Sequence, residues 1–258
     1  MPRRLLSGVV RPQWMDGRPM TEAGWLAGAE PGPMLEFLPG KATDRKLRLF
    51  ACACCRHTAA YADAEWRRMA AHGRDQAQIT ASQREAEQAR RAAEVAERYA
   101  DGLAGLAELH ALFSAPGDDE IEGIYASGAD AAWAARSSAY RARYCAEYCS
   151  PASYPRRAGF RSSSPVDRDR EQSAQSDLLR DIFGNPFRPV TADPAWLTST
   201  VLTLAQGIYA DRAFDRLPIL ADALQDAGCE NPDILTHCRG AGPHVRGCWV
   251  VDLLLGRH

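Results

Sequence analysis

The sequence lacks several features that would point directly to a function. No stretch of its 258 residues approaches the run of about 20 apolar residues that a membrane-spanning helix needs. The common motifs of dinucleotide-binding loops, phosphate-binding loops, hydrolase nucleophile elbows and zinc proteases are absent. Because 31 basic residues face 33 acidic ones, the net charge of −2 gives no general case for a nucleic acid partner. We therefore expect neither a nucleic acid nor a membrane as partner.

What is present is typical of a helical globular protein. Hydrophobic residues make up 46% of the chain and charged residues 25%, which is ordinary for a domain able to bury a core. Helix caps, helix-period apolar stripes and glycine stops predict an all-α fold, a multi-helix bundle with one main core and a disordered or loop insertion. We expect residues 1–19 to be a disordered extension, since a second candidate start, Met20, opens the string MTEAGWL. Residues 20–258 then form a single helical domain.

The insertion is predicted at about residues 150–167, where serine, proline and arginine accumulate without helical periodicity. We interpret this segment as a flexible loop within one domain, and a boundary between two domains is the alternative. A long helix is expected before it, over residues 119–149, and helix should resume at Glu171.

Further helices are predicted from local signals, among them one that ends at Gly228 and a short one that begins with Asn231 as cap and Pro232. A third begins at Thr43 or Asp44 and carries an apolar stripe to Thr58. Another begins with Asp193 as cap and Pro194 at the first helical position. The last helix is expected from Pro243 to Leu255, and its apolar residues should lie in the core.

Four strings of the chain resemble a large paralogous family of uncharacterised proteins in planctomycete bacteria. These strings are LRLFACACCR, DLLRDIFGNPFRPV, LPILADALQDAGC and HCRGAGPHVRGCWVVDLLLG. Some relatives are labelled as repeat-companion or cell-wall-assembly-regulator proteins, and no activity is established for them. The resemblance implies a bacterial cytoplasmic protein and supplies no catalytic residue.

Thiols and imidazoles are the strongest candidates for chemistry. The eight cysteines resemble reduced thiols or metal ligands more than a disulfide framework. His244 and Cys248 would face the same way on the predicted last helix, and zinc could join them to Cys54 and Cys55 of the earlier helix. No paired CxxC pattern supports such a site, and the alternative is that most of these cysteines are small buried hydrophobic residues.

Two other kinds of site are possible. The string HCRGAGPHVRG gathers basic side chains around a Gly-Pro turn, where they could bind an anion or an acidic partner: His237, Arg239, His244 and Arg246. A thiol-dependent enzyme is the other possibility, with Cys229 or Cys55 as nucleophile.

The sequence therefore leaves three functional classes open. The absence of catalytic motifs and the wide apolar helix faces favour a non-catalytic helical module that binds another protein or a companion domain. A zinc-stabilised helical domain is the first alternative, and a thiol-dependent enzyme is the second.

Overall fold

The structure, a computed structural model, describes residues 19–71, 76–105, 107–108 and 165–257. Within these ranges every secondary-structure element is a helix, so the predicted all-α class is confirmed. No helix among them is both long and apolar enough to cross a membrane. Residues 1–18 of the predicted extension, the helix predicted over 119–149 and residues 150–164 of the predicted loop lie outside the described residues. Residues 165–167 of that loop are helical, so the helix expected from Glu171 begins earlier, at Pro165.

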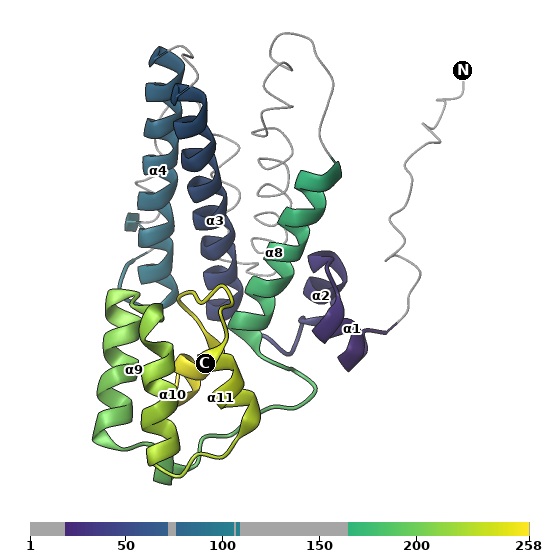
Figure 1. Cartoon of the computed structure of the whole chain (residues 1–258), viewed down its shortest axis with the longest axis vertical. Helices are drawn as coiled ribbons and strands as arrows, with labels where there is room; N and C mark the ends of the chain where they lie inside the picture. The colour runs from purple at the N-terminus through teal and green to yellow at the C-terminus, as the bar shows by residue number, and fades with distance from the viewer. Residues whose placement is uncertain (1–18, 72–75, 106, 109–164, 258) are drawn as a thin grey trace.

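The two N-terminal helices pack beside a long helix from the second half of the chain. Helices α1 (Glu22–Ala27) and α2 (Pro31–Phe37) lie beside α8 (Pro165–Phe183) in Figure 1. Trp25 is fully buried there, and its indole Nε1 donates a hydrogen bond to the backbone oxygen of Gly184 at 2.8 Å. Trp25 belongs to a first buried cluster that joins the start of the described chain to α3 and α8. Its other members include Leu38, Phe50, Leu179 and Ile182.

Helices α3 (Asp44–Ala71) and α4 (Gln76–Ala100) run side by side as a long pair. Helix α3 continues well beyond Thr58, where we expected its apolar stripe to end. In the first part of α3 and the last part of α4, Cys52 packs against three small residues of α4, Ala92, Ala93 and Ala96. Such small side chains let the two helices approach closely.

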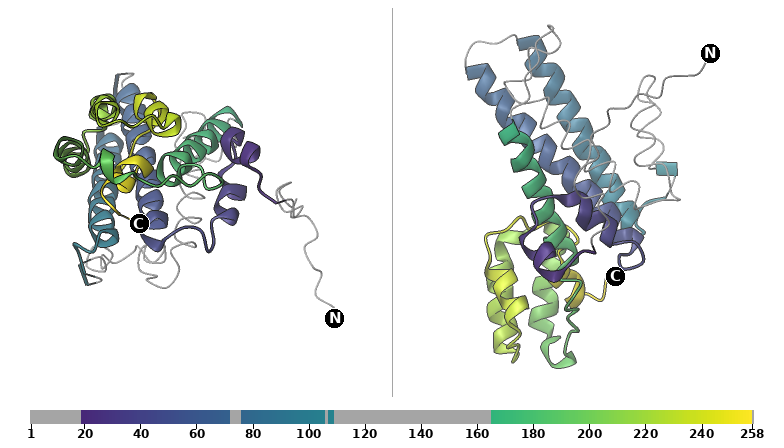
Figure 2. Two further views of the ribbon diagram at one scale, coloured as in Figure 1. Left: turned by 90° about the horizontal axis from the view of Figure 1, so that it is seen from below. Right: turned by 90° about the vertical axis from the view of Figure 1, so that its right-hand side faces the viewer.

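The C-terminal helices gather at one end of the α3–α4 pair, as Figures 1 and 2 show. They share a second buried cluster built mainly of aliphatic residues and cysteines. The elements in chain order are η3 (Pro194–Trp196), α9 (Ser199–Asp211), η4 (Phe214–Arg216), α10 (Leu217–Asp226), α11 (Pro232–Arg239) and α12 (Trp249–Leu254).

The helix predicted from Asp193 onward is divided in two. Asp193 accepts a hydrogen bond from the backbone of Ala195, but the turn that it caps is a single 3₁₀ turn. Helix α9 has its own cap, Thr198, whose side chain accepts a hydrogen bond from the N–H of Val201 at 3.3 Å. A second good capping residue so close to the first explains why the helix restarts.

The helix predicted from Pro243 to Leu255 is wrong over its first half. Only Trp249–Leu254 is α-helical, so His244 does not lie on a helix with Cys248. Gly247 has a φ of +96°, which is incompatible with a right-handed helix, and the N–H of Val245 donates to the carboxylate of Asp181 at 2.9 Å. Residues 240–248 therefore form a connecting loop between α11 and α12.

We predict that Gly247→Ala lowers the free energy of unfolding by about 2–4 kcal/mol, because the positive φ and a steric contact add together. A Cβ at this position would lie 2.9 Å from Cδ1 and 3.2 Å from Cβ of Leu49, which is buried in α3. Gly228→Ala is the matched control, since its φ is +86° but no atom lies within 4 Å of the added Cβ. Urea unfolding should show a smaller loss for Gly228→Ala, about 1 kcal/mol. Equal losses would mean that the contact with α3 contributes nothing.

Candidate metal centre

Four potential metal ligands converge where α8 meets the C-terminal helices. Asp181 lies near the end of α8 and His237 in the last turn of α11. His244 and Cys248 come from the 240–248 loop, and Cys248 occupies the N-cap position of α12. One ligand atom from each residue can be chosen so that all four atoms lie within 4.8 Å of one another. Among the described residues this is the one group of histidine, cysteine and acidic side chains with such geometry.

The separations suit a tetrahedral ion. Oδ1 of Asp181 lies 2.8 Å from Nδ1 of His244 and 3.2 Å from Nε2 of His237. Nε2 of His237 lies 3.1 Å from Sγ of Cys248. In a zinc tetrahedron with ordinary bond lengths, ligand atoms are about 3.3–3.6 Å apart. The three separations are shorter than this range, and the other pairs of ligand atoms are no more than 4.8 Å apart, so shifts on the order of 1 Å would form the site.

The hydrogen bonds of His244 indicate a positive charge at this point. Its Nε2 lies 3.1 Å from the backbone oxygen of Gly240, which can only accept a hydrogen bond, so Nε2 carries a proton. In a neutral ring, Nδ1 would then present a lone pair to the carboxylate of Asp181 at 2.8 Å, and two acceptors would repel. Either an imidazolium or a cation bound between the two atoms removes this repulsion.

The loop also supplies the outer support that metal ligands usually have. The Nε2–H of His244 points to Gly240, and the N–H of Val245 holds Oδ2 of Asp181 so that Oδ1 faces the other donors. Hydrogen bonds of this kind fix the ring orientation and strengthen ligand basicity in metalloproteins. The Val245 side chain packs against the first buried cluster, which anchors the loop to α8.

The cluster is shielded from solvent. The side chains of Asp181, His244 and His237 are 3%, 10% and 17% exposed, and Cys248 is 1% exposed. Burial raises the pKa of the Cys248 thiol well above its usual value. Burial would also raise the pKa of Asp181, but hydrogen bonds from His237 and His244 outweigh it and lower that pKa. A closed, four-donor environment of this kind is characteristic of structural metal sites.

The same residues do not form a nucleophilic triad. In a Cys-His-Asp triad the imidazole uses one nitrogen toward the thiol and the other toward the carboxylate. Here a single atom, Nε2 of His237, faces both Cys248 and Asp181, at 3.1 and 3.2 Å. Side chains that converge on one point can coordinate an ion. A proton relay instead needs one ring nitrogen at the thiol and the other at the carboxylate.

The structure brings together only part of the metal site that the sequence suggested. His244 and Cys248 belong to the cluster, but Cys54 and Cys55 do not. Cys54 is buried in the first cluster, and Cys55 packs beside the α3–α4 contact. Their places are taken by Asp181, which no local motif marks, and by His237.

The basic residues of the HCRGAGPHVRG string do not face a common anion. His237 and His244 contact Asp181, and the guanidinium of Arg239 binds Asp222 at 2.9 Å on the surface. Arg246 does not contact Asp181 and instead binds the carboxylate of Asp101 at 2.8 Å. Each of these groups therefore has an acidic partner within the protein.

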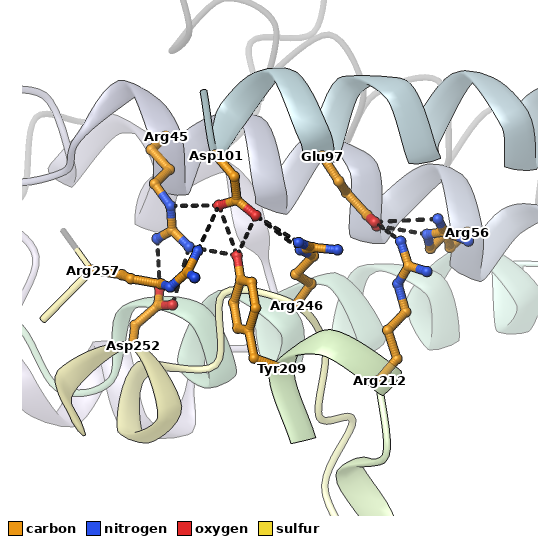
Figure 3. A network of polar contacts seen from close by, with 9 residues as sticks. All are labelled: Arg45, Arg56, Glu97, Asp101, Tyr209, Arg212, Arg246, Asp252 and Arg257. Carbon is orange, nitrogen blue, oxygen red and sulfur yellow. Dashed lines mark hydrogen bonds and ion pairs between the residues drawn. The ribbon is translucent and has the colours of Figure 1, made fainter. Parts of the chain in front are cut away.

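The contact of Arg246 belongs to a larger network that joins α3, α4, α9 and α12 (Figure 3). The carboxylate of Asp101 also accepts a hydrogen bond from Arg45 at 2.9 Å and one from the Tyr209 hydroxyl at 2.7 Å. Arg45 in turn binds both oxygens of Asp252, at 2.8 and 3.1 Å. This network ties the start of α3 and the end of α4 to the C-terminal helices.

A second group of charges in Figure 3 reinforces the same junction. Glu97 of α4 is 2% exposed and accepts a hydrogen bond from Nε of Arg56 at 2.6 Å. Arg212, which ends α9 in a left-handed conformation, also binds Glu97. Sequence reasoning identified none of these acidic residues, because Glu97 and Asp101 lie in or just after an ordinary alanine-rich helix and Asp252 lies in a short apolar one.

Comparisons of this chain with protein-family models, with curated proteins and with solved structures find no match. The geometry above therefore carries the functional argument alone.

Proposed function

We propose that this protein is a non-catalytic helical module organised by a structural zinc ion. The ion would be bound by Asp181, His237, His244 and Cys248. The observation that carries the proposal is the convergence of these four donors in one cluster, in which Asp181 and Cys248 are buried and the two histidines are partly buried. Imidazole, thiolate and carboxylate together are a donor set that zinc accepts in tetrahedral geometry.

The structural role follows from where the donors lie in the chain. One comes from α8, one from α11 and two from the loop before α12, so a single ion would connect the first and second buried clusters. With all four positions filled by protein, no position is left for water or substrate. The proposed role of the ion is therefore to stabilise the junction of α8 with the C-terminal helices.

The positions of the donors also bear on the resemblance to planctomycete proteins. All four lie within two of the strings that carry it, DLLRDIFGNPFRPV and HCRGAGPHVRGCWVVDLLLG. We extend the zinc proposal to proteins that share both strings.

A thiol-dependent enzyme fits the geometry less well. Cys229 is completely buried, and Cys55 lies well inside α3, away from a helix N-terminus, whereas a catalytic thiol is usually exposed and activated by a helix N-terminus or a neighbouring base. A module that works by binding another protein is compatible with both observations. We propose a protein partner on this basis.

The test is the metal content of protein purified without a histidine tag, measured per chain by elemental analysis. We expect about one equivalent of zinc. Removal by a strong chelator should lower the melting temperature by on the order of 10 °C, since a tightly bound ion contributes several kcal/mol to folding. Chelator saturated beforehand with zinc is the control and should leave the melt unchanged. Absence of metal together with a chelator-insensitive melt would reduce the cluster to a hydrogen-bonded network.

A further inference from the structure

A cavity of about 400 Å³ lies beside α12. It opens between the start of α3, the segment 183–190 that follows α8, and α12. Its volume falls in the range of small-molecule sites. Its apolar walls include two aromatic side chains, Phe183 and Trp249.

The charged groups around the cavity are mostly positive. Its basic residues are Lys41, Lys46, Arg188 and Arg257, and its acidic residues are Asp233 and Asp252. Both oxygens of Asp252 are already bound, by Arg45 and by Lys46, so this carboxylate adds little free negative charge. The N-terminal end of α3, where a helix dipole favours anions, also lines the cavity through Ala42 and Thr43.

Two of the basic groups keep donors available for a ligand. The ammonium of Lys41 is exposed and gives one hydrogen bond, to the backbone oxygen of Phe37 at 3.2 Å, out of the three it can make. The guanidinium of Arg257 stacks over Tyr209 and lies 3.7 Å from Asp101, but it makes no hydrogen bond within the described part of the chain. By contrast, Lys46 is held by the backbone oxygens of Ile182 and Gly247, and Arg188 pairs with Glu22.

The choice of basic residue is unusual here. The chain has 31 lysines and arginines, yet only two of them are lysines, Lys41 and Lys46, and both line this cavity. The position of the two lysines is an observation independent of the cavity's shape, and it favours the same region as a binding site.

The aromatic wall is rigid. The indole of Trp249 lies between Gly184, where an added Cβ would come within 3.1 Å of the ring, and the imidazole of His237, whose ring centre is 5.3 Å away. A fixed indole face beside basic donors suits a ligand with a flat apolar body and a negative group. We propose that this cavity binds a small aromatic anion, with its phosphate or carboxylate near Lys41 and Arg257 and its ring near Trp249. None of the basic residues invoked is a donor of the zinc centre.

The test is calorimetric titration of the full chain with phenyl phosphate, benzoate and uncharged benzyl alcohol. We expect at least one of the two anions to bind at least about 10-fold more tightly than benzyl alcohol, and their ranking distinguishes phosphate from carboxylate. Lys41→Gln should weaken binding of the preferred anion about 5- to 10-fold, and Lys41→Arg, which keeps the charge, by less than about 3-fold. Arg91→Gln, which removes an exposed charge on α4, is the matched control and should leave binding unchanged.

A second measurement locates the anion directly. Because the chain has only two lysines, the acetylation of each by an amine-reactive ester can be followed separately by mass spectrometry. Saturating anion should slow acetylation of the exposed Lys41 several-fold, whereas benzyl alcohol should not. Equal affinity for charged and uncharged probes, no detectable binding, or unchanged acetylation of Lys41 would each overturn the proposal.

Discussion

Replacing Asp101 by asparagine is expected to lower the free energy of unfolding by about 3–5 kcal/mol. The Asp101 side chain is completely buried, and its carboxylate lies against the guanidinium groups of Arg45 and Arg246 at 2.8–3.0 Å. Asparagine would keep the shape but remove the negative charge, leaving the partly buried Arg246 without its counter-charge and Arg45 with Asp252 alone. Breaking a buried pair by removing one partner costs more than the pair contributes, because the remaining charge is desolvated. Chemical denaturation of the two proteins measures the difference.

Asp222→Asn is the matched control for this prediction. Asp222 also binds an arginine, Arg239 at 2.9 Å, but its side chain is 72% exposed, so its loss should cost no more than about 0.2–1 kcal/mol. A loss for Asp101→Asn as small as that of the control would show that the network does not hold the α3–α4 pair to the C-terminal helices.

The pH dependence of the same variant gives an independent check. Burial would raise the pKa of Asp101, but hydrogen bonds from Tyr209 and Arg45 and the charges of Arg45 and Arg246 outweigh it and hold the pKa below its usual 3.8. A carboxyl group with a lowered pKa stabilises the folded state above its unfolded pKa and loses that contribution as the pH falls toward the folded value. The advantage of wild type over Asp101→Asn should therefore be constant near neutral pH and decrease only below about pH 4.

The elements that sequence alone predicted are those with local signals. Asn231 accepts hydrogen bonds from two backbone N–H groups at the start of α11, and Pro232 occupies its first position. Gly228, two residues after the end of α10, has a positive φ that stops the helix. These features depend on neighbours within a few residues, so the sequence is sufficient to identify them.

The parts that sequence reasoning missed depend on tertiary contacts. Asp181 faces inward because α8 packs against the loop after α11, and nothing near it in the sequence separates it from a solvated acid. The loop itself was predicted as helix because Pro243 and the apolar residues after it resemble a helix start. The hydrogen bond from the N–H of Val245 to Asp181 and the positive φ of Gly247 prevent a helix over these residues.

Cys248→Ala is expected to weaken zinc binding by at least about 100-fold, because it removes the one sulfur donor of the cluster. The variant should also lose the zinc-dependent part of its thermal stability, so that a chelator no longer changes its melting temperature. Substituting cobalt for zinc provides a spectroscopic measurement. Wild type should show intense tetrahedral bands and a sulfur-to-metal charge-transfer band, and the latter should vanish in Cys248→Ala.

Cys229→Ala separates this effect from the loss of a buried thiol. Cys229 is as completely buried as Cys248 and lies in the same apolar cluster, but it is not one of the four donors. Its replacement should lower stability modestly through lost packing, while zinc stoichiometry and the cobalt spectrum stay as in wild type. If both variants bound zinc like wild type, Cys248 would not be a ligand. If both lost it equally, the metal would depend on the packing of the C-terminal helices and not on this sulfur atom.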